Sequence, residues 1–328
     1  MHFSLVKYNP ENTPPSHGFD DAIFPLYYAL QNLGYTVEIL FNRCNPKSRN
    51  IIFGSCIAPR KIGRQIPRKS IIFNLEQMNE GSKWCNKDYL VHLNDYAVWD
   101  YSLVNVNGLQ ALGISGVTHT PLGYVPQMTR LAPEYPAEVD AVFYGLLTER
   151  RDALIRRMVH AGNRVLASQE AFGDLRDKLL ATAKVVLNIH QFLPARLEVV
   201  RLGYVWANRR PVLSEYRQDG EIPDHLREAC CFATYDNLPD ELNRLLADKA
   251  ALQKLATDGF TAFSSQPMTS SLEKIIGRRT GPAQKAPIKS PPPYPLLQNR
   301  PYLQAPAHEW LITNDSLDAN APTPPASR

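Results

Sequence analysis

The stretch Val139-Asp140-Ala141-Val142-Phe143-Tyr144-Gly145 opens the part of the sequence that decides the fold. It is a mostly apolar run that ends at a glycine, and after it apolar side chains recur at helical spacing as far as Gly162. Short apolar runs typical of buried strands follow at 164–167, 184–189 and 211–214, with helical patterns between them at 172–180 and 196–208. Strands and helices that alternate at this spacing predict a parallel, doubly wound α/β sheet.

Polar residues and a glycine follow these strands at their carboxyl ends, where sheets of this kind bind ligands. They are Gly145, Arg150 and Arg151 after the first strand, Asn188 and His190 after the third, and Ser214 and Glu215 after the fourth. Arginines at a helix start oppose the macrodipole unless an anion binds there, and their forked donors suit a diphosphate. Glu198 lies three residues before Arg201 on the next helix, hence on the same face, and its carboxylate suits the hydroxyls of a ribose.

Each of these residues also has a plain structural interpretation. The arginines could lie in a surface turn, Asn188 could cap a turn, His190 could be a satisfied histidine, and Glu198 could form a simple ion pair with Arg201. Their convergence at strand ends favours a nucleotide site.

The same residues carry a resemblance to a known family. The pattern 143–145, 149–151, 186–190, 198–201 and 211–215 resembles the C-terminal nucleotide-sugar domain of small bacterial and phage GT-B glycosyltransferases of the family 1 and 4 type. Retaining members carry a second glutamate and a glycine where this chain has Tyr204 and Arg209. The resemblance implies two Rossmann-like domains facing a cleft and a nucleoside-diphosphate sugar as co-substrate. It implies no further cofactor and no metal, since no DxD pair ends a strand.

The N-terminal half repeats the alternation. Strands are predicted at 3–8, 36–41, 50–54 and 70–74, and a helix ends at Gly34. We therefore expect an acceptor-side domain over 1–130, a hinge over 131–136, and a nucleotide-sugar domain over 137–277. A last helix near 272–276 is the candidate to cross back to the first domain.

The loop after the first strand holds the candidate catalytic residues His17 and Asp20, with Ser16 and Gly18 beside them. Histidine suits acid–base work because its pKa lies near neutrality, although Ser16 could simply cap the helix. Further candidates for the acceptor site or cleft are Glu76, Asp100 and Tyr124, each next to a predicted strand end. Solvation, core packing and a plain turn are the structural alternatives for these three.

Composition sets the limits on location and partners. The chain has 328 residues and a formal charge of +4, which fits an anionic substrate, does not itself imply nucleic acid and leaves that partner open. The five cysteines form no CxxC pair, which favours reduced thiols in a cytoplasm. No signal-peptide core or apolar run of membrane length is present.

The final 51 residues, 278–328, hold 11 of the 27 prolines and show no apolar periodicity. We expect a disordered or polyproline-like tail there. Its apolar island, 310–312, could dock to a protein partner.

Three functions fit this sequence. The first is a metal-independent glycosyltransferase that moves a sugar from a nucleoside diphosphate to a glycan, lipid, protein or modified DNA base. The alternatives are a nucleotide-sugar epimerase of the same architecture and a nucleotide-sugar-binding protein without catalysis. Release of nucleoside diphosphate only in the presence of an acceptor would distinguish the first.

Overall fold

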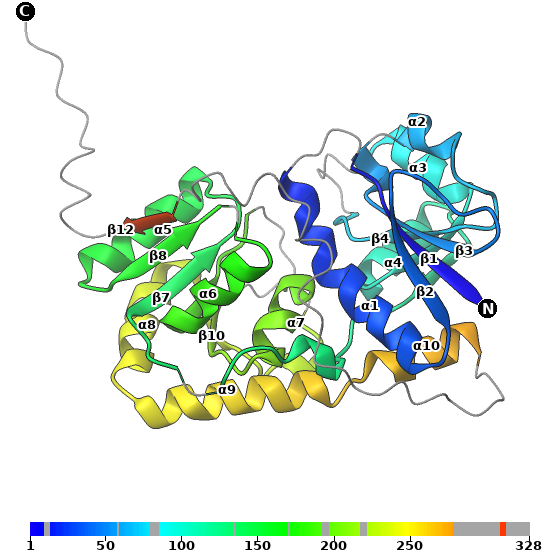
Figure 1. Cartoon of the computed structure of the whole chain (residues 1–328). Helices are drawn as coiled ribbons and strands as arrows, with labels where there is room; N and C mark the ends of the chain where they lie inside the picture. The colour runs from blue at the N-terminus through cyan, green and yellow to red at the C-terminus, as the bar shows by residue number, and fades with distance from the viewer. Residues whose placement is uncertain are drawn as a thin grey trace, which may run out of the picture. The chain divides into compact units, whose positions relative to one another are not determined.

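The computed structural model describes residues 1–9, 14–57, 59–78, 85–133, 135–169, 171–191, 197–216, 222–277 and 309–312. The described residues form two compact α/β units (Figure 1). The first contains residues 1–128 with 264–277, and the second contains 129–263 with 309–312. The side chain of Ser16 and most of the proline-rich tail lie outside the described residues. No helix in the described ranges combines the length and apolarity that a membrane span requires.

The sheet of the first unit has six parallel strands. They are β1 (His2–Lys7), β2 (Thr36–Phe41), β3 (Arg49–Phe53), β4 (Ile71–Asn74), β5 (Ala97–Asp100) and β6 (Val117–His119). Their order is β2-β1-β3-β4-β5-β6, so the chain crosses over β1 between β2 and β3. The β strands predicted from apolar runs are confirmed with ends shifted by a residue or two.

Helices cover this sheet. They are α1 (Asp20–Asn32), α2 (Pro59–Gly63), α3 (Lys87–Asn94), α4 (Leu103–Ala111) and α10 (Met268–Ile276). The side chains of Asn86 and Ser102 accept hydrogen bonds from Tyr89 N and Asn105 N and so cap α3 and α4. One core cluster packs Val6, Ile52 and Ile72 of neighbouring strands against the helices. Alternate strand residues, such as Leu5 and Ile51, are equally buried toward the opposite face.

The sheet of the second unit has five parallel strands, in the order β11-β10-β9-β7-β8, and one antiparallel edge strand, β12. The strands are β7 (Val139–Tyr144), β8 (Val165–Ser168), β9 (Ala183–Asn188), β10 (Val212–Glu215), β11 (Cys231–Ala233) and β12 (Glu309–Ile312). The helices are α5 (Glu149–His160), α6 (Asp174–Thr182), α7 (Val199–Ala207), α8 (Leu238–Leu246) and α9 (Lys249–Ser264). This is the doubly wound sheet that the sequence predicts.

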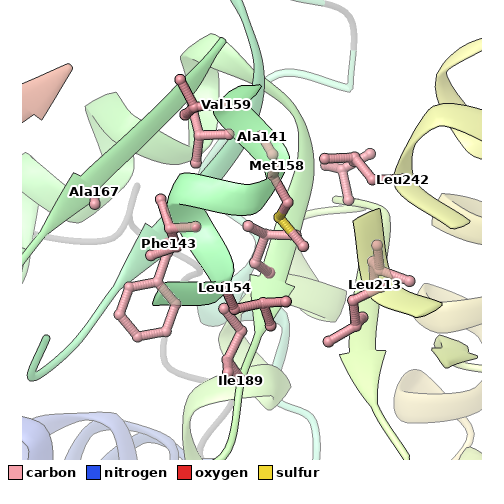
Figure 2. Close-up of a cluster of buried hydrophobic side chains, with 14 of the residues drawn as sticks. Ala141, Phe143, Leu154, Met158, Val159, Ala167, Ile189, Leu213 and Leu242 are labelled. Atoms are coloured by element: carbon pink, nitrogen blue, oxygen red, sulfur yellow. The ribbon is translucent and has the colours of Figure 1, made fainter. Parts of the chain in front are cut away.

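One face of this second sheet is covered by α5 and α8. Figure 2 shows Leu154 and Met158 of α5 and Leu242 of α8 packed against side chains of the sheet. The helical stripe predicted from the sequence is therefore the core-facing side of α5. Fully buried alternate residues such as Val142, Val186 and Val212 face the other side of the sheet.

The apolar island of the tail differs from the prediction of a tail without regular structure. Residues 309–312 form β12 and pair antiparallel with β8, Trp310 opposite Ala167 in the register. Pairing with β8 satisfies backbone groups at a sheet edge that would otherwise be open.

The last helix belongs to the first unit, although the predicted second domain extended to residue 277. α10 packs against α1, as expected for a helix that returns, and Tyr35 Oη donates to Gly277 O over 3.3 Å. Tyr124 N donates to Gln266 O (2.9 Å) and Met268 N to Tyr124 O (3.0 Å). A Cβ at Gly123 would lie 2.5 Å from Gln266 O, so only glycine permits this approach.

The segment predicted as a hinge is anchored to the second unit on its N-terminal side. Asn208 Oδ1 accepts from Arg130 N (2.7 Å) and Leu131 N (2.9 Å). The buried Arg210 donates to Ala132 O (3.0 Å) and stacks on the Tyr135 ring, 3.7 Å from its centroid. Residues 129–132 are thus part of the second unit.

Candidate functional site

The carboxyl edge of the second sheet brings together the residues predicted to bind a nucleotide. β7 leads into Gly145 and the first turn of α5, β9 ends at Asn188, β10 ends at Glu215, and α7 begins after Glu198. The topology places β9 between β7 and β10, so side chains up to 65 residues apart in sequence meet here. The cluster consists of Arg150, Arg151, Asn188, His190, Glu198, Arg201, Ser214 and Glu215.

Gly145 forms the turn between β7 and this cluster. Its φ is +132°, which side-chain-bearing residues rarely adopt, and its N–H donates to Ser168 O over 2.9 Å. A Cβ here would lie 3.6 Å from Arg201 Nη1. The glycine therefore matters first for the backbone conformation.

Arg150 and Glu215 form a bidentate ion pair. Arg150 Nη1 donates to Glu215 Oε2 (2.9 Å) and to His190 O (2.9 Å), and its Nη2 donates to Glu215 Oε1. The Glu215 side chain is 1% exposed, whereas that of Arg150 is 27% exposed above the Tyr235 ring. One edge of the guanidinium thus remains accessible, because Nε and one Nη2 hydrogen have no acceptor among the described residues.

Arg151 is buried and holds the edge together from within. Its Nε donates to Ile189 O (2.8 Å), Nη1 to Leu146 O (2.9 Å) and Nη2 to Glu198 Oε1 (3.1 Å). Burial lowers the pKa of Arg151 to about 10, with Glu198 opposing that shift, so the guanidinium stays charged at neutral pH. Its contacts are those of a residue that positions Glu198.

Arg201 links β7, β9 and α7. Its Nη1 donates to Tyr144 O (2.5 Å) and its Nη2 to Asn188 Oδ1. Asn188 Nδ2 donates in turn to Ser214 Oγ (2.9 Å), which ties β9 to β10. The strand-end polar residues are therefore connected in one network.

Glu198 lies between two arginines. Its Oε1 is 3.1 Å from Arg151 Nη2 and its Oε2 is 3.1 Å from Arg201 Nε. Burial alone would raise the pKa of the Glu198 carboxyl, but Arg201 and Arg151 outweigh it and the pKa is lowered. The side chain is 27% exposed, so an ionised carboxylate with free lone pairs can accept hydrogen bonds from a ligand's hydroxyl groups.

His190 is buried beside these charges. Its backbone N–H donates to Glu215 Oε2 over 3.0 Å. Burial lowers the pKa of the imidazole below its ordinary value, although Glu198 and Glu215 act in the opposite direction. His190 is therefore a neutral imidazole at pH 7, and the cluster's three arginines exceed its two carboxylates by one positive charge.

In the first unit, the predicted catalytic residues meet at the carboxyl end of β1. Lys7 Nζ donates to Asp20 Oδ1 (2.8 Å) and lies 3.2 Å from His17 Nδ1, which is 3.8 Å from Asp20 Oδ2. All three side chains are nearly buried. Since an ammonium group only donates, its contact with Nδ1 makes that nitrogen an acceptor and places the ring proton on Nε2.

Sequence reasoning missed Lys7. The available signal was a lysine at the last position of a strand whose other residues include Phe3, Leu5 and Val6, since a buried lysine requires a charged partner.

Asp100 and Glu76 are close in space but differ in their surroundings. Asp100 is fully buried, and its oxygens accept from Asn74 Nδ2 (2.6 Å), Ser102 N (2.9 Å) and Asn105 Nδ2 (3.0 Å). These contacts support a structural role in joining β4, β5 and α4. Glu76 is partly exposed, and Cys56 Sγ donates to its Oε1 over 3.4 Å.

The other acceptor-side candidates contribute backbone geometry. Gly18 lies in the turn before α1, where a Cβ would contact no described atom, and Tyr124 pairs with the segment before α10. Within the described ranges, no group of three or more His, Cys, Asp or Glu side chains could hold a metal ion.

No protein-family model matches the chain. The uncharacterized protein L140 of Acanthamoeba polyphaga mimivirus is 28% identical over 126 residues, which are 37% of this chain and 40% of that protein. The chain thus spans less than half of the curated relative it matches.

Solved structures are similar over more of the chain. AviGT4, a glycosyltransferase involved in avilamycin A biosynthesis, has a TM-score of 0.54 at 16% identity, over 85% of this chain and 96% of AviGT4. A mutant of T4 phage BGT in complex with UDP-glucose has a TM-score of 0.54 at 11% identity, over 84% of this chain and all of BGT. The chain covers 54% of TarM, a further neighbour. These neighbours are GT-B glycosyltransferases, and the likeness shows that this chain has the GT-B fold.

Proposed function

We propose that the protein transfers a sugar from a nucleoside-diphosphate sugar to an acceptor without a metal ion. The observation that carries this proposal is the cluster at the carboxyl edge of the second sheet, where Glu198 lies within 3.1 Å of both Arg151 and Arg201. The GT-B fold, with UDP-glucose bound in the T4 phage BGT neighbour, supports a nucleotide sugar as the ligand class.

The donor is assigned to this cluster by chemistry. Arg150 and Arg201 each retain guanidinium hydrogens that no described residue accepts, and forked N–H groups match the oxygens of a diphosphate. The amino end of α5 adds backbone N–H groups and the positive end of a helix dipole. Together these groups would stabilise the negative charge that develops on the leaving diphosphate.

Glu198 is assigned to the ribose hydroxyls. Its lowered pKa keeps it an acceptor at neutral pH, and Arg151 holds it in place from the buried side. Because such a contact exists in the ground state and the transition state alike, its loss should raise the Michaelis constant more than it lowers the turnover number.

Acid–base chemistry is assigned to Asp20 and His17. A general base must accept the proton of the acceptor's hydroxyl as that oxygen attacks the anomeric carbon. Lys7 would position Asp20 through the 2.8 Å contact and would orient the His17 ring through Nδ1. In this assignment Asp20 receives the proton and His17 positions the acceptor.

Isothermal titration with nucleoside diphosphates tests the donor assignment. We expect at least one of UDP, GDP, ADP, CDP and dTDP to bind, and Glu198→Gln to weaken that binding by about 10- to 100-fold, the range for a lost charged hydrogen bond. Glu241→Gln is the matched control, since Glu241 also pairs with an arginine, Arg244, but on α8. Absence of binding for all five nucleotides would reject the proposal.

The assignment of Asp20 and His17 is tested by measuring nucleotide affinity and turnover separately. Asp20→Asn should leave nucleotide affinity unchanged and lower the release of nucleoside diphosphate by about 10²–10⁴-fold. Full turnover in Asp20→Asn and in His17→Gln would remove both from the mechanism. Product analysis distinguishes transfer from epimerisation, which changes the sugar without releasing diphosphate.

A further inference from the structure

The first unit contains a stretch of sequence whose charged residues are all basic. Between residues 42 and 75 the chain has eight of its 36 Lys and Arg residues and none of its 32 Asp and Glu residues. The formal charge of the whole chain is +4, so everything outside this stretch is net negative. The eight residues, called the basic face below, are Arg43, Lys47, Arg49, Arg60, Lys61, Arg64, Arg68 and Lys69.

The fold places seven of these residues over one side of the first sheet, while Arg49 is the first residue of β3 itself. The crossover from β2 to β3 carries Arg43 and Lys47, and α2 with the turn before β4 carries the residues from Arg60 to Lys69. Cys44 of the crossover packs in the same core cluster as Ile62 and Ile66 of the α2 segment. Both segments therefore lie over the same face of the sheet.

The backbone beneath the basic face is held in place. Tyr96 Oη donates to Gly63 O (2.9 Å) and Ile66 O (3.2 Å), and α2 lies beside α3 (Figure 1). Asn45 Nδ2 donates to Glu38 Oε1 over 2.7 Å and anchors the crossover. The charged side chains thus project from an ordered surface: seven are exposed and Arg49 is partly exposed.

Most of these cations have no ion-pair partner. Elsewhere in the described chain three exposed arginines pair with acids: Arg157 with Asp236, Arg227 with Asp224 and Arg244 with Glu241. In the basic face, within the described residues, only Arg60 forms such a pair, with Asp88. An ordinary solvated surface mixes acidic and basic side chains, whereas a cluster of basic side chains without acidic partners complements a polyanion.

We propose that the basic face binds the phosphate backbone of a nucleic acid. Five of its eight residues are arginines, whose forked donors contact phosphate oxygens bidentately. A membrane surface fits less well, because peripheral membrane binding adds apolar side chains to basic ones. Among the described residues, Phe41 at the end of β2 is the one exposed large apolar residue that borders the stretch, and none lies between 43 and 69. This inference does not depend on the proposed sugar transfer.

Fluorescence anisotropy with a short labelled DNA duplex tests the inference on the full chain. We expect the duplex to bind. The logarithm of the association constant should fall linearly with the logarithm of salt concentration, with a slope of about −0.9 per phosphate contacted. The charge-reversal variant carries Arg64→Glu, Arg68→Glu and Lys69→Glu together, all at exposed positions. It should weaken binding at least about 10-fold and flatten the salt slope by roughly 2–3.

A matched control reverses three exposed lysines outside the basic face, Lys178, Lys249 and Lys274, none of which has a described ion pair. It makes the same change in net charge and should bind nearly as the native chain does. Equal weakening in both variants would show a nonspecific charge effect and overturn the proposal. Unchanged binding in the first variant, or retention on phosphatidylserine vesicles without duplex binding, would overturn it as well. Circular dichroism and nucleotide titration of both variants report folding and the donor site separately.

Discussion

At the scale of single residues, burial decides what an arginine–carboxylate pair contributes. Arg150 and Arg227 each pair with an acid, but Glu215 is 1% exposed and Asp224 is 91% exposed. A charge pair in water gains little, whereas a buried carboxylate that loses its partner keeps its full desolvation cost. The two substitutions to alanine should therefore differ although the removed side chain is the same.

Arg150→Ala should lower the free energy of unfolding by about 3–5 kcal/mol, because Glu215 would remain buried and unpaired. Arg227→Ala should change it by less than about 1 kcal/mol. Denaturant unfolding followed by tryptophan fluorescence, with Trp206 buried in the same unit, measures both. Equal losses of unfolding free energy in the two variants would show that protonation or water compensates the unpaired charge of Glu215. If nucleotide affinity falls in Arg150→Ala but not in Arg227→Ala, that fall reflects both this structural loss and the loss of a phosphate contact.

At the scale of elements, glycines set how closely two helices of the second unit approach. A Cβ on Gly203 of α7 would lie 2.8 Å from the Phe263 ring, and one on Gly259 of α9 would lie 2.8 Å from Trp206 Cδ1. Trp206 is fully buried and donates to Ala229 O over 2.8 Å, so it has no room to move away. The helix that carries Glu198 at its start is thus positioned by small residues far from that carboxylate.

Gly259→Ala should destabilise the second unit, although alanine is the better helix former by about 1 kcal/mol. Forcing a methyl group against Trp206 costs roughly 1–3 kcal/mol and exceeds that gain. Thr257→Ala, at an exposed position of the same helix, is the control and should be neutral or slightly stabilising. Thermal unfolding of the two variants gives the sign directly. A stabilised Gly259→Ala would mean that α7 and α9 separate without cost.

At the scale of the whole molecule, the first unit is built from two segments far apart in the sequence, 1–128 and 264–277. The chain enters the second unit after residue 128 and returns at residue 264. Met268 and Leu272 of α10 are fully buried, and α10 packs against α1. The stability of the N-terminal sheet therefore depends on residues more than 130 positions downstream.

The double substitution Met268→Ala and Leu272→Ala should destabilise the first unit, since each truncation of a buried large side chain costs about 2–5 kcal/mol. Amide hydrogen exchange should accelerate in α1, while α5 of the second unit keeps its protection. Lys274→Ala on the exposed side of α10 is the control. Faster exchange in α5 and unchanged exchange in α1 would contradict the assignment of α10 to the first unit.

The sequence by itself determined the two alternating α/β sheets and the strand ends that carry polar residues. Such patterns are local: an apolar run such as 139–144 or a stripe such as Leu154 and Met158 shows its buried face within a few neighbouring residues. The gathering of Arg150, Asn188, Glu198 and Glu215 followed as well, because parallel strands end at one edge.

Only the tertiary structure decided how those groups pair. Arg151 donates to Ile189 O, 38 residues away, and Lys7 joins His17 and Asp20 across a loop. Asp100 is enclosed by Asn74 and Asn105, although its position after a strand equally suited a catalytic group. The return of α10 and the pairing of β12 with β8 are also tertiary outcomes. The physical reason is that a charge buried away from water takes whichever partner the fold brings within about 3 Å, and sequence spacing does not encode that distance.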